Sequence, residues 1–160
     1  MPAALPAYSL RPATATDEDF LFALYASTRQ NELAAWGWPP AQCAQFLQLQ
    51  FRAQRQTYLA AYPASEHSII LLAGTPAGGI WVHRADSIRL VDIALLPEFQ
   101  NRGLGSQLIR ELLSAGKPVE LSVLQSNVRA IQLYLRLGFA IVADDGVYLR
   151  MTHKPLTSAD

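Results

Sequence analysis

The chain has 160 residues, of which 51% are hydrophobic and 16% charged, a length and composition that suit one well-cored globular domain. Lys and Arg number 13 and Asp and Glu number 13, so the formal net charge is +0 at pH 7. This balance argues against a protein that finds nucleic acid or an anionic membrane by bulk electrostatics.

The first residues predict an edge strand followed by a helix. Tyr8 and Leu10 alternate with polar neighbours ahead of Pro12, a pattern typical of a short edge strand because proline cannot continue the hydrogen-bond ladder. Thr16 precedes a run of acidic residues, which predicts a helix N-cap with acids opposing the positive end of the helix dipole. The apolar spacing carries this helix to about Asn31.

A second helix and three strands are predicted next. Apolar residues recur at helical spacing from Ala41 to Tyr62. Residues 68–73 are rich in β-branched and aliphatic side chains and predict a strand, residues 74–79 predict a turn, and residues 80–83 begin another strand. A further strand over residues 87–96 completes an expected meander.

The second half of the sequence predicts a parallel crossover and a C-terminal hairpin. A helix beginning near Gly103 is followed by a predicted strand over residues 119–123. Strand, helix and strand from 88 to 123 should form a right-handed crossover, which puts the helix start at the carboxyl end of a strand, where ligands usually bind. Asn127 is expected to cap a last helix, and residues 144–146, Asp-Asp-Gly, indicate a hairpin.

The resulting element order predicts one mixed α/β (α+β) domain. It runs strand, two helices, three strands, helix, strand, helix and two strands, with about seven strands in one central sheet and four helices. No internal repeat and no linker rich in Gly, Ser or Pro marks a boundary, so residues 1–160 are expected to form a single domain. Residues 1–7 and 155–160 are predicted to be disordered.

The remaining composition favours a reducing, cytoplasmic setting. Cys43 is the single cysteine, which allows neither an intramolecular disulfide nor a zinc cluster, and no other metal constellation is apparent. No segment reaches the roughly 20 apolar residues of a membrane-spanning helix. Low charge with a mean hydropathy of +0.12 favours a homodimer in which a second copy covers apolar surface, although a monomer is also consistent.

The segment 100–105, Gln-Asn-Arg-Gly-Leu-Gly, carries the clearest chemistry. It lies between an expected strand and the first turn of a helix, where glycines let the backbone approach a ligand and unpaired N–H groups point outward. These donors and the helix dipole favour a phosphate, and Arg102 adds a charged donor. A tight turn that needs glycine only for its geometry explains the glycine pair about as well. The segment lacks the Lys-Ser/Thr ending of a P-loop and the third glycine of a dinucleotide fingerprint.

Two motifs resemble the GNAT superfamily of N-acetyltransferases. The first is Gln or Arg, two residues, Gly, one residue, and Gly or Ala, after an apolar strand and a proline; residues 93–105 match it. The second is matched by Asn127, Ala130, Leu133-Tyr134 and Leu137-Gly138-Phe139. The resemblance covers about Ser9 to His153, and the element order predicted above is the one that the family uses.

The resemblance implies acetyl-CoA as the acyl donor and no metal. The diphosphate of acetyl-CoA would lie on the backbone amides of Gln100, Asn101, Arg102, Gly103, Leu104 and Gly105. Its pantetheine arm would pair like an extra strand against Ile93, Ala94 and Leu95. Amides at Ala94 or Leu95 would polarise the thioester, which makes backbone donors the main catalytic device.

Four side chains are candidates for direct roles. By resemblance, Tyr134 would protonate the departing CoA thiolate, although a core tyrosine on an amphipathic helix is the simpler alternative. Asn127 would contact the pantetheine, cap its helix, or do both. Glu32 or Asp92 is expected to be the general base, being the acids nearest the expected acceptor site. Alternatively, Asp92 is hydrogen-bonded within the fold and Glu32 forms a surface ion pair with Arg29.

The resemblance therefore implies an acetyl-CoA-dependent N-acetyltransferase that acts on a primary amine of a small molecule or peptide by direct attack in a ternary complex. Trp36, Trp38 and Tyr62 could line the acceptor pocket, or could belong to the core. The acceptor itself stays open, with nucleic acid and membranes not expected as partners. A non-catalytic acyl-CoA-binding or regulatory module is the alternative, and an assembly domain without CoA is a third possibility.

Overall fold

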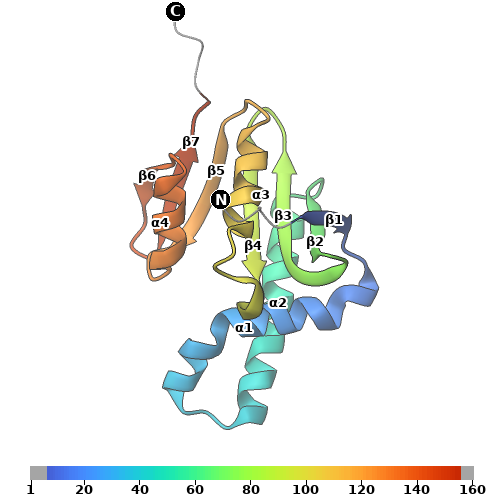
Figure 1. Cartoon of the computed structure of the whole chain (residues 1–160). Coiled ribbons are helices and arrows are strands. Elements are labelled where there is room, and N and C mark those ends of the chain that lie inside the picture. Colours follow the sequence, from blue (N-terminus) through green and yellow to red (C-terminus); the bar gives the residue numbers. More distant parts are fainter. Residues whose placement is uncertain (1–6, 156–160) are drawn as a thin grey trace, which may run out of the picture. The chain divides into compact units, whose positions relative to one another are not determined.

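The computed structural model describes residues 7–155, and these residues contain four α-helices and a seven-stranded mixed sheet of order β1-β2-β3-β4-β5-β7-β6 (Figure 1). The strands are β1 (Tyr8–Pro12), β2 (Glu66–Leu72), β3 (Thr75–Arg84), β4 (Ile88–Leu95), β5 (Val119–Leu124), β6 (Ala140–Asp144) and β7 (Tyr148–His153). The α-helices are α1 (Glu18–Trp36), α2 (Pro40–Ala61), α3 (Leu104–Leu113) and α4 (Val128–Arg136). This confirms the predicted α/β class and element order. The disorder predicted at the two ends lies, for residues 1–6 and 156–160, outside the described residues.

Within this domain the described residues form two compact units. One, the hairpin unit, comprises Ala7–Trp81 and Asp92–Gln100 and holds β1, β2 and the helical hairpin α1–α2. The other, the crossover unit, comprises Val82–Val91 and 101–155 and holds α3, β5, α4, β6 and β7. Strands β3 and β4 contribute residues to both units.

The hairpin unit is held together by apolar side chains from both helices and from β2. Leu21 and Leu24 of α1 pack with Phe51 of α2 and Ile69 of β2, all at 5% exposure or less. Strand β1 pairs antiparallel with β2 at the edge of the sheet, as the position of its proline predicted. Helix α1 continues past the predicted end at Asn31, because the first residue that favours a helix end is Gly37, with φ 67°.

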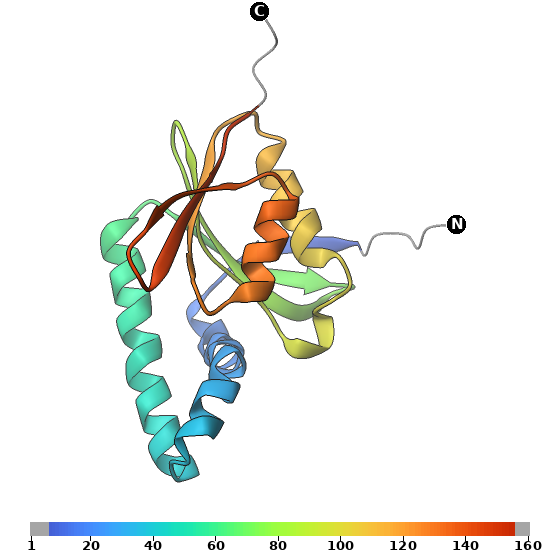
Figure 2. The ribbon, with the colours of Figure 1, turned by 90° about the vertical axis from the view of Figure 1, so that its left-hand side faces the viewer.

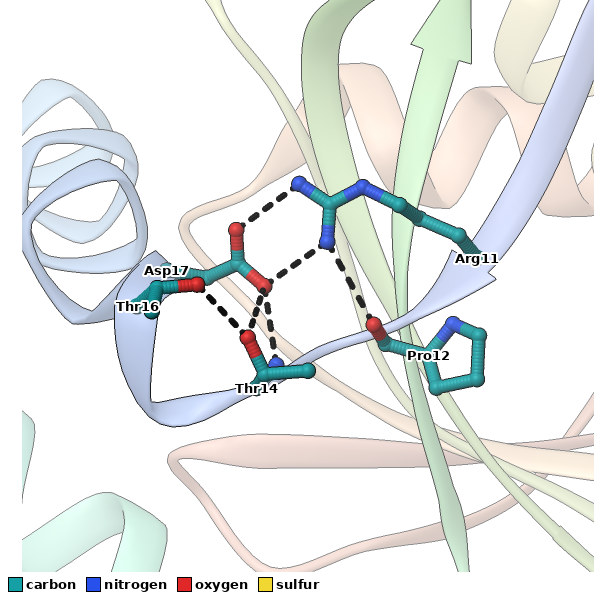
Figure 3. Close-up of polar contacts among 5 residues, drawn as sticks. All are labelled: Arg11, Pro12, Thr14, Thr16 and Asp17. Atoms are coloured by element: carbon teal, nitrogen blue, oxygen red, sulfur yellow. Dashed lines mark hydrogen bonds and ion pairs between the residues drawn. The ribbon is translucent and has the colours of Figure 1, made fainter.

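A short 3-10 turn leads into α1, which has Asp17 at its N-cap (Figure 3). The expected cap was Thr16, but Thr14 precedes a short 3-10 turn, Ala15–Asp17, and its backbone N–H donates to Asp17 Oδ2 at 2.8 Å. Arg11 of β1 donates from two guanidinium nitrogens to the same carboxylate, at 2.8 and 2.9 Å. Asp17, which is buried, therefore joins β1 to the helix start, and these donors hold its pKa well below the usual range.

The predicted turn over residues 74–79 is shorter in the structure. Only Ala73 and Gly74 form the turn, with φ 51° and 80°, and β3 already begins at Thr75. Gly78 lies inside the strand for a different reason: a Cβ there would lie 2.2 Å from the backbone oxygen of Ala94 in β4. The glycine density therefore reflects close approach of two strands as well as a turn.

The crossover unit contains the predicted parallel pairing of β4 with β5. Ile88 to Leu90 lie opposite Val119 to Leu121, and α3 connects the two strands. Strand β5 also pairs antiparallel with β7, and β7 with β6, so the predicted C-terminal hairpin is confirmed. Figures 1 and 2 show α3 and α4 on one side of β5, β7 and β6. In residues 7–155, none of the helices is long and apolar enough to cross a membrane.

Candidate active site

The connection from β4 to α3 carries the predicted diphosphate loop. A short 3-10 turn, Pro97–Phe99, follows β4, and Gln100 comes next in an extended conformation. The side-chain amide of Gln100 donates to the backbone oxygen of Leu95 at 2.9 Å. Both residues belong to the hairpin unit, so this glutamine fixes the end of β4 relative to the beginning of the loop.

The loop enters α3 through two left-handed residues. Asn101 has φ 64° and Gly103 has φ 80°, and Gly103 stands at the N-cap of α3 without a side-chain cap. The first amides of an α-helix have no partner within the helix, and no side chain at the cap position accepts from them here. Backbone donors at the start of α3 are thus available to an anion, in a region where the helix dipole favours negative charge.

Different physical reasons explain the two glycines of this loop. Gly103 is explained by its positive φ, which side chains rarely adopt. Gly105 has no positive φ, and a Cβ there would contact only Leu133 at 3.9 Å, an ordinary van der Waals distance. Because the protein's own packing does not require glycine at position 105, close approach of a ligand to this backbone is the better explanation.

Helix α4 lies beside this loop within the crossover unit. Asn127 caps α4, as predicted, with its side chain accepting from the amide of Ala130 at 3.3 Å. From the first turn of α4, the guanidinium of Arg129 donates to Oδ1 of Asn101, the left-handed loop residue. Sequence reasoning missed Arg129, because nothing in its local pattern indicates a partner 28 positions away.

Tyr134 lies further along α4 and is 6% exposed. Its ring lies 5.6 Å from that of Phe139, centroid to centroid, and its backbone oxygen accepts from the Phe139 amide at 3.0 Å. The tyrosine is therefore anchored as a core residue of the crossover unit. This burial is compatible with both readings of the sequence, since a proton donor also benefits from a fixed position.

In the hairpin unit, the predicted backbone donors are the last three residues of β4, Ile93, Ala94 and Leu95, and they are half-buried. Asp92 precedes them; the residue as a whole is exposed, although protein atoms crowd its carboxyl group. The protein around the carboxyl group nevertheless desolvates it and raises its pKa to about 6, while the amide of Ile93 opposes the shift. Desolvation thus sets the pKa of Asp92 above the ordinary value of an aspartate.

The other predicted candidates of the hairpin unit do not meet at one place. Glu32 accepts from Nε of Arg29 at 2.8 Å, which is the surface ion pair considered from the sequence. Trp36 and Trp38 gather with Phe46 at the turn between α1 and α2. Tyr62 follows the far end of α2, and a helix of 22 residues is about 33 Å long. These aromatic residues therefore cannot line a single pocket, which corrects that expectation.

The model of the acetyltransferase (GNAT) family matches residues 23–139, which is most of the chain. The chain belongs to the GNAT acetyltransferase family. No curated protein sequence matches it significantly. Among residues 7–155, no group of three or more His, Cys, Asp or Glu side chains could hold a metal ion.

Solved structures of other GNAT proteins share the fold. PaiA N-acetyltransferase from Thermoplasma acidophilum, in complex with coenzyme A, is 17% identical with a TM-score of 0.69, over 94% of this chain and 99% of that one. YncA from Salmonella typhimurium, with its cofactor acetyl-CoA, is 17% identical with a TM-score of 0.57, over 96% and 97%. Naa50 from Arabidopsis thaliana, in complex with the bisubstrate analogue CoA-Ac-MVNAL, is 14% identical with a TM-score of 0.58, over 92% and 98%.

Proposed function

We propose that this GNAT domain transfers the acetyl group of acetyl-CoA to a primary amine of a small molecule or peptide, by direct attack within a ternary complex. Family membership supports acetyl transfer in general. CoA or acetyl-CoA in structures of the same fold supports the choice of donor. Acetyl-CoA would supply an acetyl thioester, an acyl group activated toward amines.

The observation that carries the proposal is Gly105, a helical glycine that the fold itself does not need. The backbone amides of the loop, from Gln100 to Gly105, would hold the diphosphate, and Arg102 would add a charged donor. The backbone of Ile93 to Leu95 would hold the pantetheine arm, and an amide at Ala94 or Leu95 would donate to the thioester oxygen.

Three side chains would handle protons and orientation. Tyr134 would donate a proton to the departing thiolate, and Asn127 would contact the pantetheine arm in addition to capping α4. Asp92 is the favoured general base, because a carboxyl group with a pKa of about 6 is largely ionised at neutral pH and still basic enough to accept a proton. Glu32 is the second candidate; its ion pair with Arg29 would have to open.

Calorimetric titration with acetyl-CoA and with CoA tests the donor site. We expect saturable binding of both at micromolar concentration. Absence of binding at millimolar ligand would remove the donor assignment, and with it the proposed reaction.

A homodimer remains our expectation for the quaternary state, and light scattering on the purified chain measures it directly.

The alternative function, a non-catalytic acyl-CoA-binding module, differs from the enzyme at Tyr134. For the enzyme we expect Tyr134→Phe to lower kcat by roughly 10²-fold or more, the usual size of a lost proton donor, with little change in acetyl-CoA affinity. Initial rates of CoA release across a panel of primary amines provide the measurement. A wild-type protein that binds acetyl-CoA but acetylates none of these amines would favour the module.

A further inference from the structure

The crossover unit ends in an edge strand that is open to solvent. Strand β6 lies at the end of the sheet order, beyond β7 (Figure 1). All five of its residues are exposed. Because the backbone N–H and C=O groups on the outer side of an edge strand have no partner strand, they can pair with a strand of another chain. Strand β6 therefore offers a second chain a row of hydrogen-bonding groups.

The middle of this edge is apolar. Ile141 is 48% exposed and Val142 is 55% exposed, and Ala143 follows them. The pairing register of β6 with β7 shifts at Val142, so this residue has no partner in β7. Such a bulge re-aims a side chain and hinders pairing with an unrelated strand. A second copy of the chain carries the same bulge and can match it about a two-fold axis.

The opposite edge of the sheet shows what a protected edge strand looks like. Strand β1, in the hairpin unit, contains Arg11 and Pro12 within its five residues. A charged side chain and a proline are common means of preventing an edge strand from pairing with other chains. Strand β6 has neither between Ala140 and Ala143. Its sequence thus resembles that of a strand that is covered by a partner.

The two ends of β6 carry opposite charges. Asp144 ends the strand and Asp145 follows it. Arg136, the last residue of α4, and Lys154, directly after β7, lie at the other end, where Ala140 begins the strand. All four charged residues are exposed, and among residues 7–155 none of them forms an ion pair. The edge therefore has an acidic end, an apolar middle and a basic end.

We propose that β6 pairs antiparallel with β6 of a second copy of the chain, about a two-fold axis near Val142. The acidic end of one protomer then lies beside the basic end of its partner, and the apolar residues meet in the middle. A parallel arrangement would bring like charges together, which is unfavourable. A two-fold contact of this kind is closed, because it uses the same edge of both protomers and leaves none for a third chain. The proposal does not depend on acetyl transfer.

Sedimentation velocity of the full chain over a concentration series tests the interface. We expect the wild type to dimerise with a micromolar Kd. Val142→Lys places two like charges at the axis and should raise the dimer Kd by roughly tenfold or more. Leu49→Lys is the matched control, because Leu49 is a 67% exposed residue of α2 in the hairpin unit, and it should keep the wild-type Kd. Thermal unfolding establishes that both variants are folded.

Two further variants test the orientation and the charges. Val142→Cys in a Cys43→Ser background should form a disulfide-linked dimer on mild oxidation, because side chains at the axis face one another, whereas Leu49→Cys in the same background should not. Lys154→Glu makes the basic end less positive and should weaken the dimer at low salt. Added salt should reduce the difference from the wild type, since it screens exposed charges.

The outcomes separate this proposal from the proposed function. A wild type that stays monomeric at millimolar concentration overturns the dimer. A dimer that survives Val142→Lys but is lost in Leu49→Lys overturns the assignment to β6, and assemblies that grow beyond two copies overturn the closed pairing. Calorimetric titration of Val142→Lys with acetyl-CoA should give the wild-type affinity. Loss of acetyl-CoA binding in the wild type overturns the proposed function and leaves the dimer proposal intact.

Discussion

Gly105 is the residue that distinguishes the proposed ligand-binding role of the loop from the role of an ordinary turn. The neighbouring glycine, Gly103, has a left-handed backbone, so any substitution there combines strain with an effect on binding. Position 105 lies within α3, where glycine is less favourable than alanine by about 1 kcal/mol. Glycine at this position weakens the helix and relieves no close contact in the fold, so neither helix stability nor packing explains it.

We therefore expect Gly105→Val to reduce acetyl-CoA affinity by at least roughly tenfold, since even one lost or displaced hydrogen bond to a charged group costs about 1.5–3 kcal/mol. Gly105→Ala adds the smallest side chain at the same place, so it should reduce the affinity less than Gly105→Val does. Calorimetry measures the affinity, and thermal unfolding establishes that both variants remain folded. Unchanged affinity in a folded Gly105→Val protein would show that the loop is only a turn.

Asp92 makes a prediction about pH. Its folded-state pKa of about 6 lies above the ordinary value, so its protonated form favours the folded state and this contribution declines as pH rises from about 4 through 6. A general base works in the opposite direction, because only the ionised carboxylate accepts a proton. We expect kcat/KM to rise with pH through an inflection near 6, and Asp92→Asn to remove that inflection and most of the activity.

Glu32→Gln is the companion variant for this experiment. It removes the ion pair with Arg29 but should retain the inflection near pH 6 if Asp92 is the base. Rate profiles for both variants and the wild type, taken between pH 5 and 9, supply the comparison. A normal acidic limb in Asp92→Asn, together with its loss in Glu32→Gln, would transfer the role to Glu32.

The pairing of β3 with β4 depends on a glycine that has no role in a turn. Gly78→Ala would place a methyl group 2.2 Å from the Ala94 oxygen and 2.9 Å from a methyl of Leu95, so β4 would have to move. We expect a loss of about 1–3 kcal/mol in the free energy of unfolding, the usual cost of overpacking. Gly79→Ala would meet no atom closer than the flexible end of Leu24 at 3.4 Å and should cost less. Urea denaturation of the two variants measures the difference.

The link between β1 and α1 predicts a second pH dependence. The pKa of Asp17 is held down by Arg11 and then by the Thr14 amide, so its stabilisation is present above the ordinary carboxyl pKa of about 4. It is lost as pH falls toward the lowered folded value. Asp17→Asn should therefore lower the urea midpoint at pH 7 and converge with the wild type in acid. A difference that is equally large at pH 7 and pH 3 would contradict this assignment.

Much of the fold could be predicted from patterns within single segments. Helical spacing and β-branched runs predicted every helix and strand in the correct order, and Asn127 was correctly identified as a cap. The errors occurred where a contact from another segment decided the boundary. Asp17, which binds Arg11, stands at the N-cap of α1 instead of Thr16, and β3 already includes Gly78, which lies against Ala94. Such contacts depend on strand register, which local spacing does not specify.

The same reasoning applies to the site. The position of the loop from Gln100 to Gly105 directly before a helix start was predictable from consecutive residues, and its binding of a diphosphate stays a prediction. The bond from Arg129 to Asn101 spans 28 positions, and that from Arg89 to Ser122 spans 33. In the sequence, each of these arginines has the pattern of a solvent-exposed side chain, because its partner lies in a distant segment.

The hairpin unit also carries its own optical reporters. Of the three tryptophans in the chain, Trp36 and Trp38 are partly exposed with ring centroids 5.0 Å apart, whereas Trp81 is 4% exposed. The Trp81 ring stacks on His67 at 4.1 Å, and its indole N–H donates to Ser65. The emission spectrum should thus contain a red-shifted component from the helical turn and a blue-shifted component from β3. Protonation of His67, whose pKa burial lowers to about 4, should quench only the blue component, so one fluorescence titration distinguishes two regions of this unit without a label.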